Sequence, residues 1–192
     1  MRIWVELYGL GQQICQDICV SDRVAHEIQM ELLSLTREHW PMVREIYVAG
    51  ILSGDATFET AAPSWEKWNT AHLSFARLVA CVGTQVKGWA ALSAVSTRPA
   101  YSGVAEVSVY VASNCRGQGY GRALLKALIA ESEKNGIWTL QASIFPENHA
   151  SISLHKAGGF REVGRRERIA KLNGVWRNTV LMERRTALME SK

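Results

Sequence analysis

The segment Arg116-Gly117-Gln118-Gly119-Tyr120-Gly121 places a guanidinium and three glycines directly before a helical pattern. Glycines let the backbone approach a ligand closely. The free amides and the dipole at the start of a helix favour a negatively charged group, and Arg116 adds a fork of donors that suits phosphate oxygens. The segment therefore predicts a site for a phosphate or a pyrophosphate.

The spacing of this glycine segment excludes two other phosphate sites. A P-loop requires GxxxxGK[ST], and no Lys-Ser or Lys-Thr pair follows here. A dinucleotide site requires GxGxxG and an acidic residue at the end of the next strand, whereas this chain has GxGxG and "WTLQASIF" ends without one. A glycine-rich turn that only opens a helix is the simpler alternative.

Two side chains have the chemistry of proton transfer. Glu106 stands at the start of an alternating apolar stretch, where a carboxylate near a buried site could act as a general base. His155 lies seven residues after Asn148 and four after Ser151, which places the three on one helix face. A solvated carboxylate and a structural histidine are the simpler interpretations.

The surrounding pattern predicts an α+β domain around one sheet. Strands are expected over 30–35 (short and buried), 75–82, 86–95, 105–112, 137–145, 160–172 and 175–185, with an extended segment at 56–60. Helices are expected after a cap at Thr36, over 63–73 with Ser64 as cap, over 119–135 and over 147–159. Gly83-Thr84 and Asn173-Gly174 predict hairpin turns.

The length of 192 residues fits one compact domain. Clear periodicity begins only at Met30. Residues 1–29 are therefore expected to be an extension, non-native or poorly ordered, before a domain at 30–185 and a tail at 186–192.

Charge and composition exclude several classes of protein. The net charge is +4 without a clustered basic stripe, which argues against nucleic-acid binding. No apolar segment is long enough to span a bilayer, and the N-terminus lacks a signal-peptide pattern, so no membrane partner and a cytoplasmic location are expected. The cysteines and histidines show no metal spacing, and we expect no metal.

Two motifs together resemble the signatures of the GNAT N-acetyltransferase family. Arg116-x-x-Gly119-x-Gly121 is similar to its pyrophosphate signature, and residues 148–160 resemble its "N-x-x-[SA]-x-x-L-Y-x-x-x-G-F" helix, with His155 in place of Tyr. "TFET" at 57–60, "RPAY" at 98–101, "EVSVYV" at 106–111 and "GVWRN" at 174–178 resemble the phosphinothricin and methionine-sulfoximine acetyltransferase branch. The resemblance runs from about Met30 to Arg185. It implies a mixed, mostly antiparallel sheet with helices on both faces, acetyl-CoA as co-substrate and a homodimer.

The resemblance also implies a role for each matching residue. Glu106 would be the base that deprotonates the acceptor amine, and His155 would protonate the departing thiolate. Cofactor contacts would come from the main chain of Val109 and Val111 and from Arg116, Gly117, Gln118, Gly119, Tyr120, Gly121, Arg122, Asn148 and Ser151. The acceptor would be bound by Phe58, Arg98, Tyr101, Glu106 and Trp176.

The expected activity is acetyl-CoA-dependent acetylation of the α-amino group of a small amino-acid analogue of the phosphinothricin or methionine-sulfoximine type. One alternative changes the acceptor to a protein N-terminus or a polyamine, and the cation at Arg98 argues against the polyamine. A second alternative is a catalytically silent acyl-CoA-binding module, against which Glu106 argues.

Overall fold

The computed structural model describes residues 29–186. The strands are β1 (Met30–Ser34), β2 (Leu78–Val82), β3 (Gln85–Ala94), β4 (Val104–Val111), β5 (Thr139–Ile144), β6 (Arg161–Leu172) and β7 (Val175–Arg185). The helices are α1 (Trp40–Ser53), α2 (Trp65–Ala71), α3 (Tyr120–Lys134) and α4 (His149–Ala157), with short 3₁₀ turns at Arg37–His39, Pro99–Tyr101 and Ser113–Cys115.

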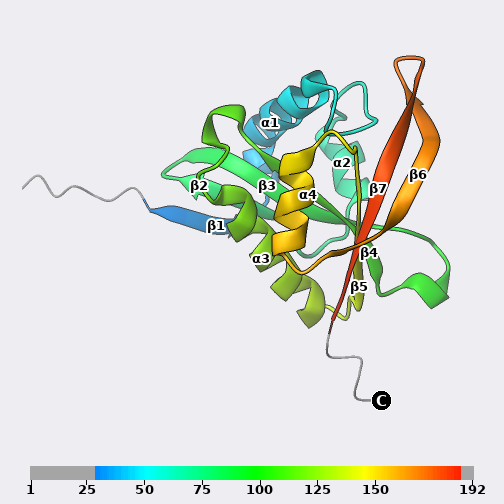
Figure 1. Ribbon diagram of the computed structural model, residues 1–192. Helices are drawn as coiled ribbons and strands as arrows, with labels where there is room; N and C mark the ends of the chain where they lie inside the picture. Colours follow the sequence, from blue (N-terminus) through cyan, green and yellow to red (C-terminus); the bar gives the residue numbers. More distant parts are fainter. Residues whose placement is uncertain (1–28, 187–192) are drawn as a thin grey trace, which may run out of the picture.

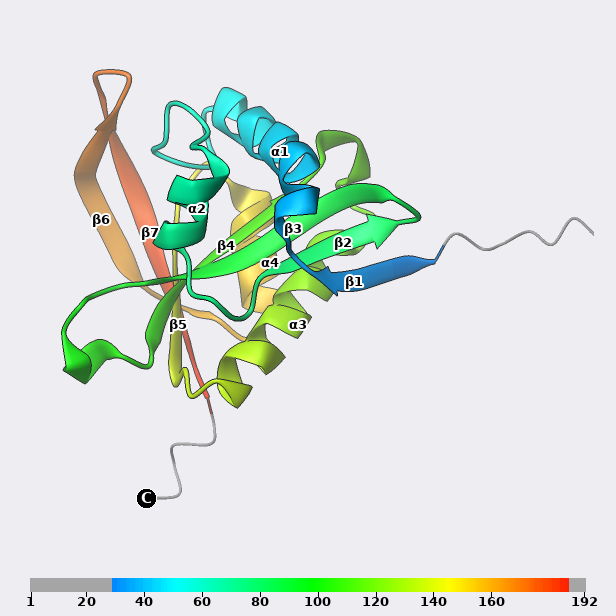
Figure 2. The ribbon, with the colours of Figure 1, turned by 180° about the vertical axis from the view of Figure 1, so that it is seen from behind.

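These strands form one seven-stranded sheet in the order β1-β2-β3-β4-β5-β7-β6. Neighbouring strands are antiparallel except β4 and β5, which are parallel. Figures 1 and 2 show α1 and α2 on one face of the sheet and α3 and α4 on the other, with the tip of the β6–β7 hairpin standing out beyond the sheet. The expected α+β domain with a mixed sheet is confirmed.

Side chains that alternate along the central strands contribute to two hydrophobic cores, one on each face of the sheet. Ala90 and Leu92 of β3 belong to the cluster that packs against Leu124 and Leu128 of α3. Trp89 and Ala91 belong to the opposite cluster, which includes Trp40, Tyr47 and Trp68. Each fully buried large apolar side chain stabilises the fold by about 1.5–3 kcal/mol. The central strands are therefore packed against buried side chains on both faces.

Local signals in the sequence are confirmed at several positions. Asn173 and Gly174 have φ values of 49° and 82°, as a type I′ turn requires. Ser64 accepts a hydrogen bond from the Lys67 amide at the start of α2. Gly136, with φ of 77°, follows the end of α3.

Two expectations about the elements were wrong. All residues of β1 are exposed rather than buried, because β1 lies at the edge of the sheet and, within residues 29–186, pairs only with β2. Residues 56–60 form a loop. The expected cap at Thr36 is confirmed: Thr36 is the N-cap of the 3₁₀ turn Arg37–His39, which runs directly into α1.

The domain limits are only partly described. Thr186, placed in the tail by the sequence, is buried, and its amide donates to the Trp138 carbonyl oxygen at 3.0 Å. Thr186 is therefore packed with the described part of the chain. Residues 1–28 of the expected extension and residues 187–192 of the expected tail lie outside the described residues.

Candidate active site

The parallel strands β4 and β5 pair over only a short stretch. Their register ends with Glu106 opposite Gln141, after which β5 continues alongside β7 as far as Ile144. A cavity of about 610 Å³ is lined by residues 106–111 of β4 and by residues 142–145 at the end of β5. The cavity therefore occupies the place where two neighbouring strands part.

The glycine loop forms one end of this cavity. Gly117 and Gly119 have φ values of 76° and 90°, a backbone conformation that favours glycine. Gly119 is the N-cap of α3 and has no side chain to occupy the first-turn amides, which lack intrahelical partners in any helix. Arg116 and Arg122 also line the cavity. This end presents donors and positive charge, as an anionic group requires.

Close packing fixes the position of the glycine loop. A Cβ at Gly121 would lie 3.3 Å from Leu154 of α4 and 3.5 Å from Val111 of β4. The Gln118 side chain donates to the Asn114 carbonyl oxygen at 3.0 Å. Gln118 is not among the residues that line the cavity. Gln118 therefore closes the loop on itself.

Glu106 lies at the point where β4 and β5 part. The Gln141 side-chain amide donates to Glu106 Oε2 at 3.4 Å. Glu106 is half-buried and lines the cavity. A carboxylate therefore lines the cavity at the point where the two strands part.

His155 lines the cavity from α4 and is buried. Its Nδ1 lies 2.8 Å from the Ser151 carbonyl oxygen, so Nδ1 carries the proton. Burial lowers the pKa of His155, against the opposing effect of this hydrogen bond. The imidazole is therefore neutral near pH 7, and its Nε2, which lacks a protein partner among the described residues, is an acceptor.

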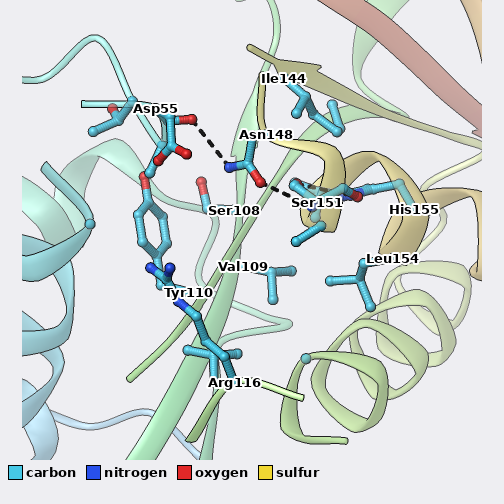
Figure 3. Close-up of a pocket in the computed structure, with 18 of the residues that line it drawn as sticks. Asp55, Ser108, Val109, Tyr110, Arg116, Ile144, Asn148, Ser151, Leu154 and His155 are labelled. Atoms are coloured by element: carbon cyan, nitrogen blue, oxygen red, sulfur yellow. Dashed lines mark hydrogen bonds between the residues drawn. The ribbon is translucent and has the colours of Figure 1, made fainter. Parts of the chain in front are cut away.

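The Asn148 side chain connects two distant segments. Its Oδ1 accepts from the Ser151 amide at 3.0 Å and caps α4, and its Nδ2 donates to the Asp55 carbonyl oxygen at 3.1 Å. Figure 3 shows Asn148 between Asp55 and Ser151. Asn148 therefore holds the loop between α1 and α2 against α4.

The other acceptor candidates divide into two groups. Phe58 lines the cavity and packs edge-on against Phe145, with ring centroids 4.8 Å apart. Arg98, Tyr101 and Trp176 are exposed and do not belong to the described lining. Arg98 lies over the Tyr101 ring at 5.9 Å, and Lys171 lies over the Trp176 ring at 4.8 Å. Within one chain these three residues stand apart from the cavity.

Tyr110 forms an aromatic wall of the cavity. It stacks on Trp89 with centroids 4.6 Å apart and meets Tyr47 edge-on at 5.0 Å. Burial is the main cause that raises the pKa of Tyr110, so its hydroxyl stays protonated near neutral pH. Gly50 of α1 permits this packing, because a Cβ there would lie 2.8 Å from the Tyr110 ring.

Sequence reasoning missed several residues at this site. Asp55 and Thr57 line the cavity from the loop after α1, and Ser143 lines it from β5. Arg166 of β6 donates to Ser143 Oγ at 2.6 Å, across the intervening strand β7. Thr57 belongs to the 57–60 segment of the resemblance, but no motif marks Asp55, Ser143 or Arg166, because segments far apart in the chain bring them together.

Residues 29–186 contain neither a candidate metal site nor a candidate membrane-spanning helix. Over residues 29–186, no group of three or more His, Cys, Asp or Glu side chains is placed to hold a metal ion. In the same range, no helix is both long enough and apolar enough to cross a membrane.

Comparison with known proteins agrees with this geometry. Residues 35–160 match the acetyltransferase (GNAT) family. The chain belongs to this family. This GNAT chain is 35% identical over 153 residues to a phosphinothricin N-acetyltransferase of Alcaligenes faecalis, covering 75% of the chain and 76% of that protein. A phosphinothricin acetyltransferase of Sinorhizobium meliloti, solved with acetyl-CoA, superposes with a TM-score of 0.77 at 29% identity, over 85% of this chain and 92% of that one.

A second relative is an acetyltransferase with a different name. The GNAT chain is 33% identical over 99 residues to an L-methionine sulfoximine/L-methionine sulfone acetyltransferase of Pseudomonas aeruginosa, which is 52% of this chain and 58% of that protein. Several matches span a little over half of the relative's length. The family and these relatives support an acyltransferase enzyme with a fold of the GNAT type.

Proposed function

We propose that this protein transfers the acetyl group of acetyl-CoA to the amino group of a small amino-acid analogue of the phosphinothricin or methionine-sulfoximine type. One observation carries the proposal: β4 and β5 part at Glu106, and the resulting cavity ends at the donor-rich start of α3. The names of the relatives support the choice of acceptor.

In this proposal the pyrophosphate of acetyl-CoA lies at residues 116–122, and its pantetheine arm follows the parted edge of β4 toward Glu106. Val109, Val111 and Ser151 all line the cavity, and in this proposal they flank the pantetheine arm. Main-chain groups at 109–111 would stabilise the oxyanion that forms as the thioester is attacked.

The acetyl transfer needs a base and a proton donor. Glu106 takes a proton from the acceptor ammonium, directly or through water. The amine nitrogen attacks the thioester carbonyl carbon, the new C–N bond forms, the C–S bond breaks, and the thiolate takes up a proton. His155 is neutral, and its Nε2 is an acceptor. His155 can therefore protonate the thiolate only after Nε2 has itself received a proton.

A cation close to the cavity supports an acidic acceptor. Arg166 donates a hydrogen bond to Ser143, and Ser143 lines the cavity. The Arg166 guanidinium is therefore in direct contact with a residue of the cavity wall. A guanidinium suits a carboxylate or phosphinate. Arg98, Tyr101 and Trp176 remain acceptor-binding candidates in a homodimer, since exposed residues of one copy are free to reach the cavity of another.

A second candidate acceptor is a di- or polyamine. Asp55 and Glu106 both line the cavity, whereas Arg98 does not. Two carboxylates suit an acceptor with a second ammonium group.

A coenzyme A release assay separates these acceptors. Phosphinothricin, methionine sulfoximine, methionine sulfone, free amino acids and polyamines are compared at equal concentration. We expect turnover with the sulfoximine or phosphinothricin group. Turnover with polyamines alone would favour the polyamine as the acceptor, and no turnover with any amine would contradict both candidates.

A homodimer in the cytoplasm is also part of the proposal. Sedimentation velocity tests whether the protein is a dimer.

A further inference from the structure

We propose that Arg177 is a positioning residue that sets the shape of the acceptor end of the cavity by holding the 54–58 loop from the β6–β7 hairpin. The inference rests on the acetyl transfer proposed above for the identity of the acceptor. Its structural part, that Arg177 holds this loop, stands on contacts within the chain.

The 54–58 loop needs an external support. Asp55, Ala56, Thr57 and Phe58 all line the cavity, yet the loop contains no helix or strand. Gly54, at φ of 74°, ends α1 and turns the chain into the loop. A segment of this kind takes its position from the groups that bind it.

Arg177 binds this loop directly. Its Nη1 donates to the Gly54 carbonyl oxygen at 2.9 Å, although the two residues are 123 positions apart. Its Nη2 donates to Glu147 Oε2 at 3.3 Å. The guanidinium thus spans the loop and the segment that leads into α4, and its planar fork fixes the direction of both contacts.

Arg177 also supports the loop through an aromatic ring. Its Cζ lies 4.2 Å from the centroid of the Phe145 ring. Phe58 packs edge-on against that same ring at 4.8 Å. Loss of the guanidinium therefore removes a support of Phe145 as well as the bond to Gly54, and Phe58 would lose its fixed position in the cavity wall.

The pyrophosphate end of the cavity has separate supports. Gly121 packs against Val111 and Leu154, and Gln118 bonds to Asn114 within the glycine loop. None of these contacts involves Arg177. The loss of Arg177 should therefore weaken acceptor binding and leave acetyl-CoA binding unchanged.

Steady-state kinetics of the full chain test this separation with Arg177→Lys and Arg177→Ala. We expect the acceptor KM to rise about tenfold in Arg177→Ala and about threefold in Arg177→Lys, which retains the charge without the fork. The KM for acetyl-CoA should stay within about twofold of the parent value. Arg161→Ala is the matched control, because Arg161 lies on the same hairpin and pairs with Glu183, away from the cavity lining.

Hydrogen–deuterium exchange gives a readout that does not depend on the acceptor. Exchange over residues 54–58 should rise in Arg177→Ala and Arg177→Lys and stay unchanged in Arg161→Ala, with thermal denaturation confirming that each variant is folded. Unchanged exchange in folded Arg177→Ala, or equal rises in both KM values, would overturn the positioning role. If the parent protein acetylates no amine while the exchange rises as expected, the proposed function fails and the support by Arg177 stands.

Discussion

The side-chain amide of Gln141 donates to Oε2 of Glu106 at 3.4 Å, at the last residue pair before β4 and β5 part. The strand register itself therefore places the carboxylate at the opening of the cavity. A base in this position needs no flexible loop to deliver it.

Glu106→Gln should reduce kcat by about 10²–10⁴-fold, because the neutral amide cannot accept the ammonium proton. The loss should shrink as the pH rises toward the pKa of the free amine, since more acceptor is then already deprotonated. Stopped assays from pH 6.5 to 9.5 measure kcat, and calorimetry measures acetyl-CoA binding, which should not change. Glu183→Gln is the control, because Glu183 lies on β7, two strands from β4, and does not line the cavity. A kcat within about threefold of the parent value would remove Glu106 from the role of base.

Gly119→Ala should weaken acetyl-CoA binding, and Gly136→Ala should not. Both glycines have left-handed φ values, 90° and 77°, and a Cβ at either would meet nothing within 4 Å. Each substitution should cost about 1–2 kcal/mol of stability through backbone strain, but only Gly119 lies at the cavity end of α3. Urea denaturation and calorimetry measure the two effects. Equal acetyl-CoA affinities in both variants would contradict a pyrophosphate site at this loop.

Gly50→Ala should destabilise the protein, although alanine favours a helix by about 1 kcal/mol relative to glycine. The added Cβ would lie 2.8 Å from Tyr110, whose ring is already stacked on Trp89 and cannot move away freely. Overpacking of this kind costs about 1–3 kcal/mol. Urea denaturation gives the free energy of unfolding, with Gly164→Ala as the control, where a Cβ would meet nothing within 4 Å. A more stable Gly50→Ala protein would show that the ring gives way.

The free energy of unfolding should fall as the pH drops below 6.5. Burial lowers the pKa of both His72 and His155 from the ordinary value of 6.5. Below that value the unfolded chain binds protons that the folded chain does not, so each histidine removes up to about 1.4 kcal/mol per pH unit until its folded pKa is reached. Their contribution is complete above pH 6.5.

The measurement for this pH dependence is urea denaturation at pH 7.5 and pH 5.5. His155→Asn retains a donor near the position of Nδ1 and removes the titration, so the difference between the two pH values should become smaller. A difference that does not change in His155→Asn would show that His155 is not buried in its neutral form.

The sequence predicted those parts of the fold and the site that depend on local patterns. The hairpin at Asn173-Gly174 and the cap at Ser64 follow from short-range chemistry, and so does the start of α3 after Gly119. The exposure of β1 could not be predicted, because an apolar strand reads the same at the edge and in the centre of a sheet.

The contacts that the sequence did not reveal join residues over long separations. Asn148 reaches Asp55 across 93 positions, and Arg177 reaches Gly54 across 123. Neither pair has a spacing that a motif could express. The exposure of Arg98 likewise depends on where the β3–β4 connection lies relative to the cavity, which composition cannot show.

The parting of β4 from β5 also affects the thermodynamics of the empty protein. Beyond Glu106 and Gln141, β4 and β5 no longer pair, so the sheet has an edge in its interior. Backbone donors and acceptors at this edge lack the partners that a neighbouring strand would provide. An amide-bearing ligand in this gap would contribute to the sheet as a strand segment does. Saturation at one hundred times its dissociation constant would then raise the free energy of unfolding by about 2.7 kcal/mol. For such an enzyme, its co-substrate would also serve as a stabilising part of the folded protein.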